Sequence, residues 1–276
     1  MKRRDFLTAG SAGLAVLTTA ATASAQNRER LSARLRQTPA TLTIPKQFIE
    51  VRKYAVKDAE KRAKLVEVLD QALIPALNRQ GIKPVGVLVP IPSATKYANN
   101  VFVVFPHKTA ESFVNVAAKL LADTAYMKDA APIFETTSKD PVYTDCETYF
   151  LQGFPTMPTI EVPDLGPNRV FEWRFYRSFN IERNAAKIRM FDVGGELPLF
   201  REVGMNPIFF GDVIAGNWLP ALMYMIGFSS MEAHAEAWKA FGAHPKWQAM
   251  RGLPEYADTA TEIVNAIMTP SPGSQI

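Results

Sequence analysis

The sequence predicts an α+β fold in which two copies of one β-α-β-β-α-β unit pack against each other, sheet to sheet. The motif Glu-x-Arg-x-Tyr at 50–54 returns at 172–176, an offset of 122 residues. Other positions return at nearly the same spacing: Pro75 as Pro198, Gly81 as Gly204, Pro84 as Pro207, Phe105 as Phe228 and Tyr126 as Trp247. Strand-like and helix-like patterns also follow one another in the same order in both copies. The near-constant spacing indicates a duplicated domain.

The first copy begins with an alternating run at 48–56, which predicts a half-buried strand. Asp58 is placed to cap a helix whose leucines at 65, 69, 73 and 77 recur every four residues. Pro75 predicts a kink in this helix, and Gly81 predicts its end. The unit continues with strands at 85–89 and 101–105, a helix at 109–121, a helical turn near Tyr126 and a strand at 143–151.

The second copy repeats this order. A strand is predicted at 170–177, and Asn180 is placed to cap a helix at 181–191 that the segment 193–196 interrupts. Further strands are predicted at 207–213, 221–228 and 262–268. Ser229 and Glu232 predict a capping box for a helix that reaches Phe241. Each copy is thus expected to form a ferredoxin-like sheet with both helices on one face, so the two bare faces can close an α+β barrel within one chain.

The chain divides into five segments. Residues 1–25 have the features of a twin-arginine signal peptide: Arg3 and Arg4, a short apolar run, and a small-x-small cleavage site ending at Ala25. They predict a periplasmic or secreted protein without a stable membrane span. A linker is expected at 26–45, a first domain at 46–152, a proline-rich linker at 153–168 and a second domain at 169–270.

Charge and cysteine content exclude several classes of function. The net charge is +4, but residues 1–36 carry +5, which leaves the remainder near neutral and disfavours a nucleic-acid partner. The single cysteine, Cys146, cannot form an intramolecular disulfide. The three histidines lack metal-ligand spacing, and no nucleotide-binding motif is present, so we expect neither a metal nor a cofactor.

Several of these motifs resemble the NIPSNAP family. They are the Glu-x-Arg-x-Tyr strand, the helix that ends before Pro75 or Pro198, and the Gly-x-x-Pro sequence that follows it. The segment 244–250 is similar to the family's Asp-Pro-x-Trp motif, with His244 in place of the acid. The first copy keeps Asp123 and an aromatic residue at Tyr126. The resemblance extends over nearly all of residues 47–270.

The resemblance implies a dimeric α+β barrel but no catalytic set, because the family has no agreed one. Its mitochondrial members are linked to vesicle trafficking and mitochondrial quality control through interaction partners. Neighbouring families on this barrel include cofactor-free monooxygenases, lactone isomerases and haem-binding enzymes, which is an analogy of fold alone.

Strand alternation predicts where a site would lie. On the second strand motif, Phe171, Trp173 and Phe175 face one way, and we expect that face to lie under the helices. The opposite face would point into the barrel from both copies. This gives the candidate ligand-binding residues Glu50, Arg52, Tyr54, Glu172, Arg174 and Tyr176, with His107 at the end of a strand.

Two interpretations of these residues remain open. The glutamates and arginines either pair with each other as a structural feature, or they line a polar cleft for a small apolar or anionic organic ligand. We therefore expect an exported small-molecule-binding or interaction protein that uses the barrel, rather than an enzyme. The alternative is a cofactor-independent monooxygenase or isomerase in the same barrel, and a structural assembly unit or homo-oligomer also stays open.

Overall fold

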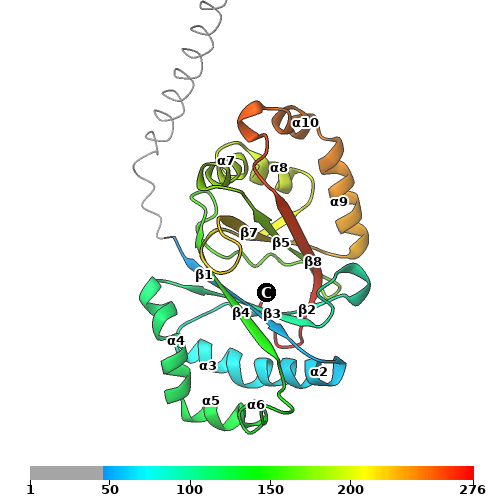
Figure 1. The fold of residues 1–276 in the computed structure, drawn as a ribbon. Helices are drawn as coiled ribbons and strands as arrows, with labels where there is room; N and C mark the ends of the chain where they lie inside the picture. The colour runs from blue at the N-terminus through cyan, green and yellow to red at the C-terminus, as the bar shows by residue number, and fades with distance from the viewer. Residues whose placement is uncertain (1–45) are drawn as a thin grey trace, which may run out of the picture. The chain divides into compact units, whose positions relative to one another are not determined.

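The computed structural model describes residues 46–276, in which eight strands form one closed antiparallel barrel (Figure 1). The order around the barrel is β1-β3-β2-β8-β5-β7-β6-β4. Each half of the chain supplies four neighbouring strands in the ferredoxin-like order, and the pairs β2–β8 and β4–β6 join the halves. The predicted α+β barrel within one chain is confirmed. The predicted signal peptide and first linker lie outside the described residues.

The strands fall close to the predicted ranges. Those of the first half are β1 (Phe48–Ala55), β2 (Gly86–Pro90), β3 (Asn100–His107) and β4 (Asp145–Gly153). Those of the second half are β5 (Val170–Arg177), β6 (Asn206–Ala215), β7 (Ala221–Phe228) and β8 (Glu262–Pro270).

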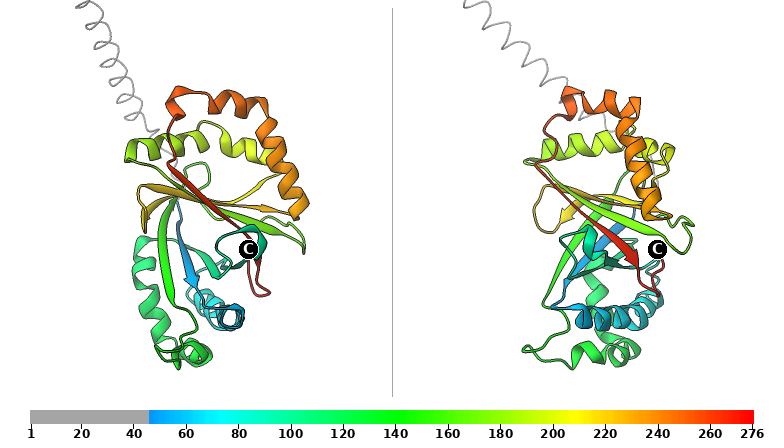
Figure 2. Two further views of the ribbon diagram at one scale, coloured as in Figure 1. Left: turned by 45° about the vertical axis from the view of Figure 1, so that its right-hand side comes forward. Right: turned by 90° about the vertical axis from the view of Figure 1, so that its right-hand side faces the viewer.

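The helices cover the outside of the barrel. The first half has α2 (Ala59–Val68), a π-helical turn (Leu69–Leu73), α3 (Ile74–Arg79), α4 (Ala110–Ala122), α5 (Thr124–Asp129) and α6 (Ala131–Phe134). The second half has α7 (Ile181–Phe191), α8 (Glu196–Glu202), α9 (Met231–Ala243) and α10 (Pro245–Arg251). Figure 2 shows the helices of each half on the outer side of that half's strands.

The predicted helix ends follow from local chemistry. Asp58 and Asn180 each accept a hydrogen bond from the backbone N–H three residues on, as helix caps do. Pro75 has no N–H to donate to the preceding turn, and the helix adopts π geometry just before it. The predicted capping box at Ser229 is wrong, because Ser230 caps α9 through the N–H of Ala233 and Glu232 is one residue too early for the reciprocal bond.

The barrel interior is filled with apolar side chains from both halves. These are Ile49, Val51, Leu88, Phe102, Val104, Tyr149, Leu151, Phe171, Trp173, Phe175, Ile208, Phe209, Val213, Ala221, Met223, Met225, Val264, Ala266, Met268 and Ile276. Two further cores lie between the strands and the helices, one in each half. The apolar side chains of β1 and β5 therefore point into the barrel. The prediction that they lie under the helices is wrong.

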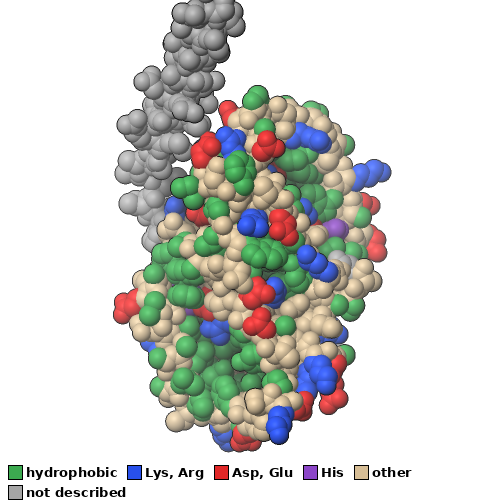
Figure 3. Space-filling view, viewed as in Figure 1, with side chains coloured by type: hydrophobic (Ala, Val, Ile, Leu, Met, Phe, Trp, Pro, Cys, Tyr) green, Lys and Arg blue, Asp and Glu red, His purple; other side chains and the backbone are tan. Residues whose placement is uncertain are grey.

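The surface carries charges of both signs. On the face shown in Figure 3, acidic and basic side chains alternate with apolar ones. Within the described part of the chain, every helix is too short or too polar to cross a membrane.

We expect the two halves to unfold in one transition, because they share a core and two strand pairs. Met223→Ala removes a fully buried side chain from the barrel interior and should lower the free energy of unfolding by about 2–5 kcal/mol. Urea denaturation is monitored by circular dichroism and by tryptophan fluorescence. Both signals should give the same single midpoint, and Met223→Ala should lower that midpoint in both. Val193→Ala, at a side chain 70% exposed, is the control. Two separate transitions, of which only one moves, would contradict this expectation.

Candidate functional site

The predicted residues of the first half form a buried ionic cluster under the helices. Arg52 Nε donates to Glu50 Oε1 at 2.5 Å, and His107 Nε2 lies 2.9 Å from Glu50 Oε2. The other imidazole nitrogen of His107 lies 2.9 Å from Ser112 Oγ at the start of α4. Glu50 and His107 are each 1% exposed. The carboxylate and the imidazole are therefore buried, whereas the Arg52 side chain is 15% exposed.

Tyr54 lies beside this cluster, next to Arg52. The Arg52 guanidinium sits over the Phe105 ring, 5.1 Å from its centroid. Tyr54 packs edge-on against Tyr143, with ring centroids 5.1 Å apart. Burial raises the pKa of the Tyr54 hydroxyl, although the charge of Arg52 opposes the shift. Both side chains thus belong to the core between β1 and the helices.

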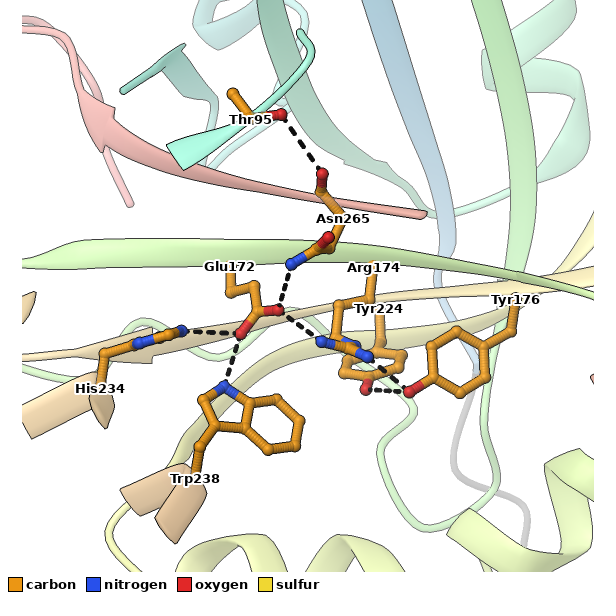
Figure 4. A network of polar contacts seen from close by, with 8 residues as sticks. All are labelled: Thr95, Glu172, Arg174, Tyr176, Tyr224, His234, Trp238 and Asn265. Carbon is orange, nitrogen blue, oxygen red and sulfur yellow. Dashed lines mark hydrogen bonds and ion pairs between the residues drawn. The ribbon is translucent and has the colours of Figure 1, made fainter. Parts of the chain in front are cut away.

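The predicted residues of the second half form a larger network around Glu172 (Figure 4). The carboxylate accepts hydrogen bonds from four side chains: Arg174 at 2.5 Å, Trp238 at 2.6 Å, and His234 and Asn265 at 2.9 Å each. Burial raises the pKa of Glu172, but the bond to His234, the charge of Arg174 and the bond to Asn265 outweigh it and lower this pKa to about 2. The carboxylate is fully engaged and stays ionised.

Arg174 and its tyrosines complete this network. The guanidinium lies between two rings, 4.8 Å from the centroid of Trp238 and 5.4 Å from that of Tyr176. Its Nε donates to Tyr176 Oη at 3.2 Å, and this hydroxyl lies 3.1 Å from Tyr224 Oη. Burial lowers the pKa of Arg174, and the nearby tyrosines and Glu172 raise it further than burial lowers it. The arginine is therefore held by its own half of the chain.

The prediction that these two sets converge inside the barrel is wrong. Tyr54 belongs to the helix-side core of the first half and Tyr176 to that of the second, and the barrel interior lies between them. The helices supply donors such as His234 and Trp238 to the buried carboxylate, whereas the barrel interior offers mainly apolar neighbours. Because a buried carboxylate needs donors, the charged face turns to the helices. Pairing of glutamate with arginine, the structural interpretation, is what the geometry shows.

The two halves reach the same carboxylate–imidazole contact by different routes. His107 pairs with the first residue of β1 and Phe228 with the first residue of β5, so these two positions correspond. This register corrects the alignment of Phe228 with Phe105 by two residues. The same offset of 121 equates Phe113 on α4 with His234 on α9. Histidine and phenylalanine have exchanged places between strand and helix.

The ring contact survives the exchange. The centroids of His107 and Phe113 are 5.9 Å apart, and those of Phe228 and His234 are 4.8 Å apart. In both halves an imidazole Nε2 lies 2.9 Å from the buried glutamate. A donor to this carboxylate is thus retained, whichever element supplies it.

A pocket of about 90 Å³ opens at the barrel mouth where β1 and β5 end. This volume holds on the order of three water molecules. It is lined by Lys53, Tyr97, Glu147, Tyr149, Trp173, Phe175, Asn217, Trp218 and Val264. None of these residues was predicted as a site. The available signal was Lys53, a charged residue on the same strand face as Ile49 and Val51.

The polar wall of this pocket is a network around Glu147. Lys53 Nζ lies 2.5 Å from Glu147 Oε1, and the Tyr149 hydroxyl donates to Oε2 at 2.6 Å. Asn217 donates to the same oxygen at 3.3 Å. Burial raises the pKa of Glu147, but the bonds to Lys53 and Tyr149 lower it below its usual value. Burial and the bond to Glu147 raise the pKa of Tyr149.

The pocket also contains an unused donor. Trp173 is 2% exposed, and its indole Nε1 has no hydrogen-bond partner among the described residues. Tyr97 packs edge-on against this indole, with centroids 5.8 Å apart, and Phe175 lies 6.2 Å away. Buried polar groups in proteins nearly always have a partner, so an unpaired donor on a residue of the pocket wall is an exception that calls for an explanation.

The mouth is polar on one side and apolar on the other. Lys53 pairs with Glu147 across β1 and β4, and the corresponding pair across β5 and β8 is Phe175 with Val264. Tyr149 corresponds in the same way to Ala266. The first half thus contributes the charges and the second half the apolar surface. Within the described residues, no group of three His, Cys, Asp or Glu side chains is placed to hold a metal ion.

We expect the histidine–phenylalanine exchange to be reproducible by mutation. His107→Phe removes a donor to the buried Glu50 and should lower the free energy of unfolding by about 1–3 kcal/mol. The double variant His107→Phe with Phe113→His copies the arrangement of the second half and should recover most of this loss. Urea denaturation measures both, with Phe113→His alone as the control. A double variant no more stable than His107→Phe would contradict the assignment.

Comparisons with known proteins support the fold and the family. The sequence profile of the NIPSNAP family matches residues 168–275. No curated protein has a matching sequence. A candidate monooxygenase from Lactobacillus acidophilus is similar in structure at 10% identity, with 82% of this chain and 94% of that chain covered and a TM-score of 0.54. An anthrone oxidase-like protein is similar at 13% identity, covering 82% and 92%, with a TM-score of 0.51.

At these identities the two likenesses concern the fold alone. A NIPSNAP family protein from Agrobacterium tumefaciens matches 40% of this chain and 99% of its own at 19% identity, with a TM-score of 0.36. The profile match covers the whole second set of strands, from β5 to β8. Residues 168–275 therefore match the NIPSNAP family, to which the sequence motifs showed a resemblance.

Proposed function

We propose that this protein binds a small amphipathic organic molecule in the pocket at the barrel mouth. The observation that carries the proposal is Trp173, a residue of the pocket wall whose buried indole N–H has no acceptor among the described residues. A carbonyl or carboxylate oxygen of a ligand would satisfy it. The candidate residues predicted from sequence are replaced in this role by Lys53, Trp173 and their neighbours.

The walls select the class of ligand. Lys53 and the Tyr149–Glu147 pair give one side a polar character, whereas Phe175, Val264 and Trp218 give the other an apolar one. Trp218 is 48% exposed and lies 6.2 Å from the Phe175 ring, so its side chain forms an edge of the opening. Only the functional group of a ligand fits inside about 90 Å³, and its apolar part would rest against these rings.

Binding is favoured over catalysis in this pocket. The carboxylate of Glu147 is bound to Lys53, Tyr149 and Asn217, and its lowered pKa makes it a weak general base. The raised pKa of Tyr149 keeps its hydroxyl protonated. The similarity to oxygenases is one of fold, and it assigns no reaction to these residues.

The proposal is tested with benzoate and benzamide as probes. Both carry a ring and an oxygen acceptor, and only benzoate carries a charge for Lys53. Titration should shift the indole N–H resonance of Trp173 in ¹H–¹⁵N spectra. Trp173→Phe keeps a ring but lacks the donor, and it should weaken binding about tenfold, the loss expected for one buried hydrogen bond to a charged group.

Trp247→Phe is the matched control, because Trp247 packs on Phe241 at a centroid distance of 4.5 Å and is absent from the pocket lining. Benzoate binding that is equal in Trp173→Phe and the unaltered protein would disprove the proposal. So would the lack of any shift of the Trp173 resonance with either probe.

We propose further that the chain is exported by the twin-arginine route. The support is the sequence pattern of Arg3 and Arg4, the apolar run and the small residues up to Ala25. Replacing both arginines by lysine keeps the charge and should leave the unprocessed protein in the cytoplasm. Cell fractionation and immunoblotting of the full chain measure this, with Arg28→Lys beyond the cleavage site as the control. Continued processing and release of the double variant would exclude this route.

A further inference from the structure

A second groove lies on the outside of the barrel, between α7 and the end of β6. Its volume is about 380 Å³, within the range of small-molecule sites. Most of its lining is apolar: Ile181, Ile214 and Leu219 are 80%, 48% and 42% exposed, and Ile188 also lines the groove. Large aliphatic side chains gathered in one open groove are a feature of binding surfaces.

The groove also has a polar element that is buried. Asn184 on α7 is 6% exposed, and its Nδ2 donates to Asp212 Oδ1 at 2.9 Å. This bond fixes the orientation of the amide, because an ionised carboxylate accepts and cannot donate. The amide oxygen, Asn184 Oδ1, is then buried without a donor among the described residues. Both side chains line the groove.

The charge in the groove is negative. Burial raises the pKa of Asp212, and the hydrogen bond from Asn184 and the charge of Lys46 oppose this rise. Lys46 acts on Asp212 through its charge, whereas Asn184 forms the hydrogen bond. Arg183, next to Asn184 in the sequence of α7, is bound to Glu182 and to the carbonyl of Ala257. The carboxylate therefore remains available for a cation from outside.

We propose that this groove binds a primary alkylammonium ion. A positively charged group with more than one N–H would satisfy both the amide oxygen of Asn184 and the carboxylate of Asp212, and the isoleucines and Leu219 fit an alkyl chain. A carboxylate or phosphate ligand would be repelled by Asp212, and an alkyl chain without an N–H or O–H would leave the buried amide oxygen without a donor. The groove shares no lining residue with the pocket at the barrel mouth, so this proposal is independent of the proposed function.

The probe is n-hexylammonium, compared with two molecules of the same chain length. Hexyltrimethylammonium keeps the charge but has no N–H, and 1-hexanol has a hydroxyl but no charge. Calorimetry on the unaltered protein should show saturable binding of n-hexylammonium, with each of the other two about tenfold weaker or more. In methyl-labelled protein the signals of Ile181 and Ile214 should move on titration.

Asp212→Asn keeps the shape of the groove and removes its charge, and it should weaken n-hexylammonium binding about tenfold. Glu202→Gln removes an exposed carboxylate on α8 that is paired with Lys246, and it should leave binding unchanged. Equal affinity for 1-hexanol and n-hexylammonium, no saturable binding, or unchanged binding in Asp212→Asn would each overturn the proposal. The comparison of the three probes decides it even where Asp212→Asn does not fold.

Discussion

The pairing of β2 with β8 and of β4 with β6 closes the barrel, and this closure determines which face of each strand points inward. These two pairs leave no strand edge in the described barrel without a partner, and they close a space that both halves must fill. The inward faces are therefore the most apolar ones, and each strand's charged face is left on the side of the helices. The position of the buried glutamates, and of the donors that satisfy them, follows from this closure.

The buried carboxylates show how strongly one requirement constrains a duplicated fold. Glu172 is held by an arginine, an imidazole, an indole and an amide, and Glu50 by an arginine and an imidazole. An unpaired buried charge is strongly destabilising, so each glutamate keeps its donors. The sequence positions that supply these donors differ between the two halves. The exchange of histidine and phenylalanine between strand and helix is an example, because two residues differ and the contact of imidazole with carboxylate is kept.

The sequence contains enough information for the architecture and too little for the site. Repeat spacing, alternation and caps such as Asp58 and Asn180 gave nearly every strand and helix its range, because these signals are local. Alternation also separated the two faces of β1 and β5, but periodicity does not state which face the helices cover. That choice depends on donors such as Trp238, whose reach to Glu172 is set only by tertiary packing. The lone Lys53 on an apolar strand face is a local signal for the barrel mouth, but it was not used to predict the site.

The unlike walls of that mouth have a consequence for assembly and evolution. Because neighbouring strands are all antiparallel and their order repeats after four, β1 and β5 run in the same direction and the pseudo-twofold axis passes along the barrel. A homodimer of identical half-length chains would place the same residues on both sides of this axis, two Lys–Glu pairs or two Phe–Val pairs. A single chain whose two halves have diverged can place different residues on the two sides of the axis. It can offer one ligand one orientation, at a stoichiometry of one molecule per chain.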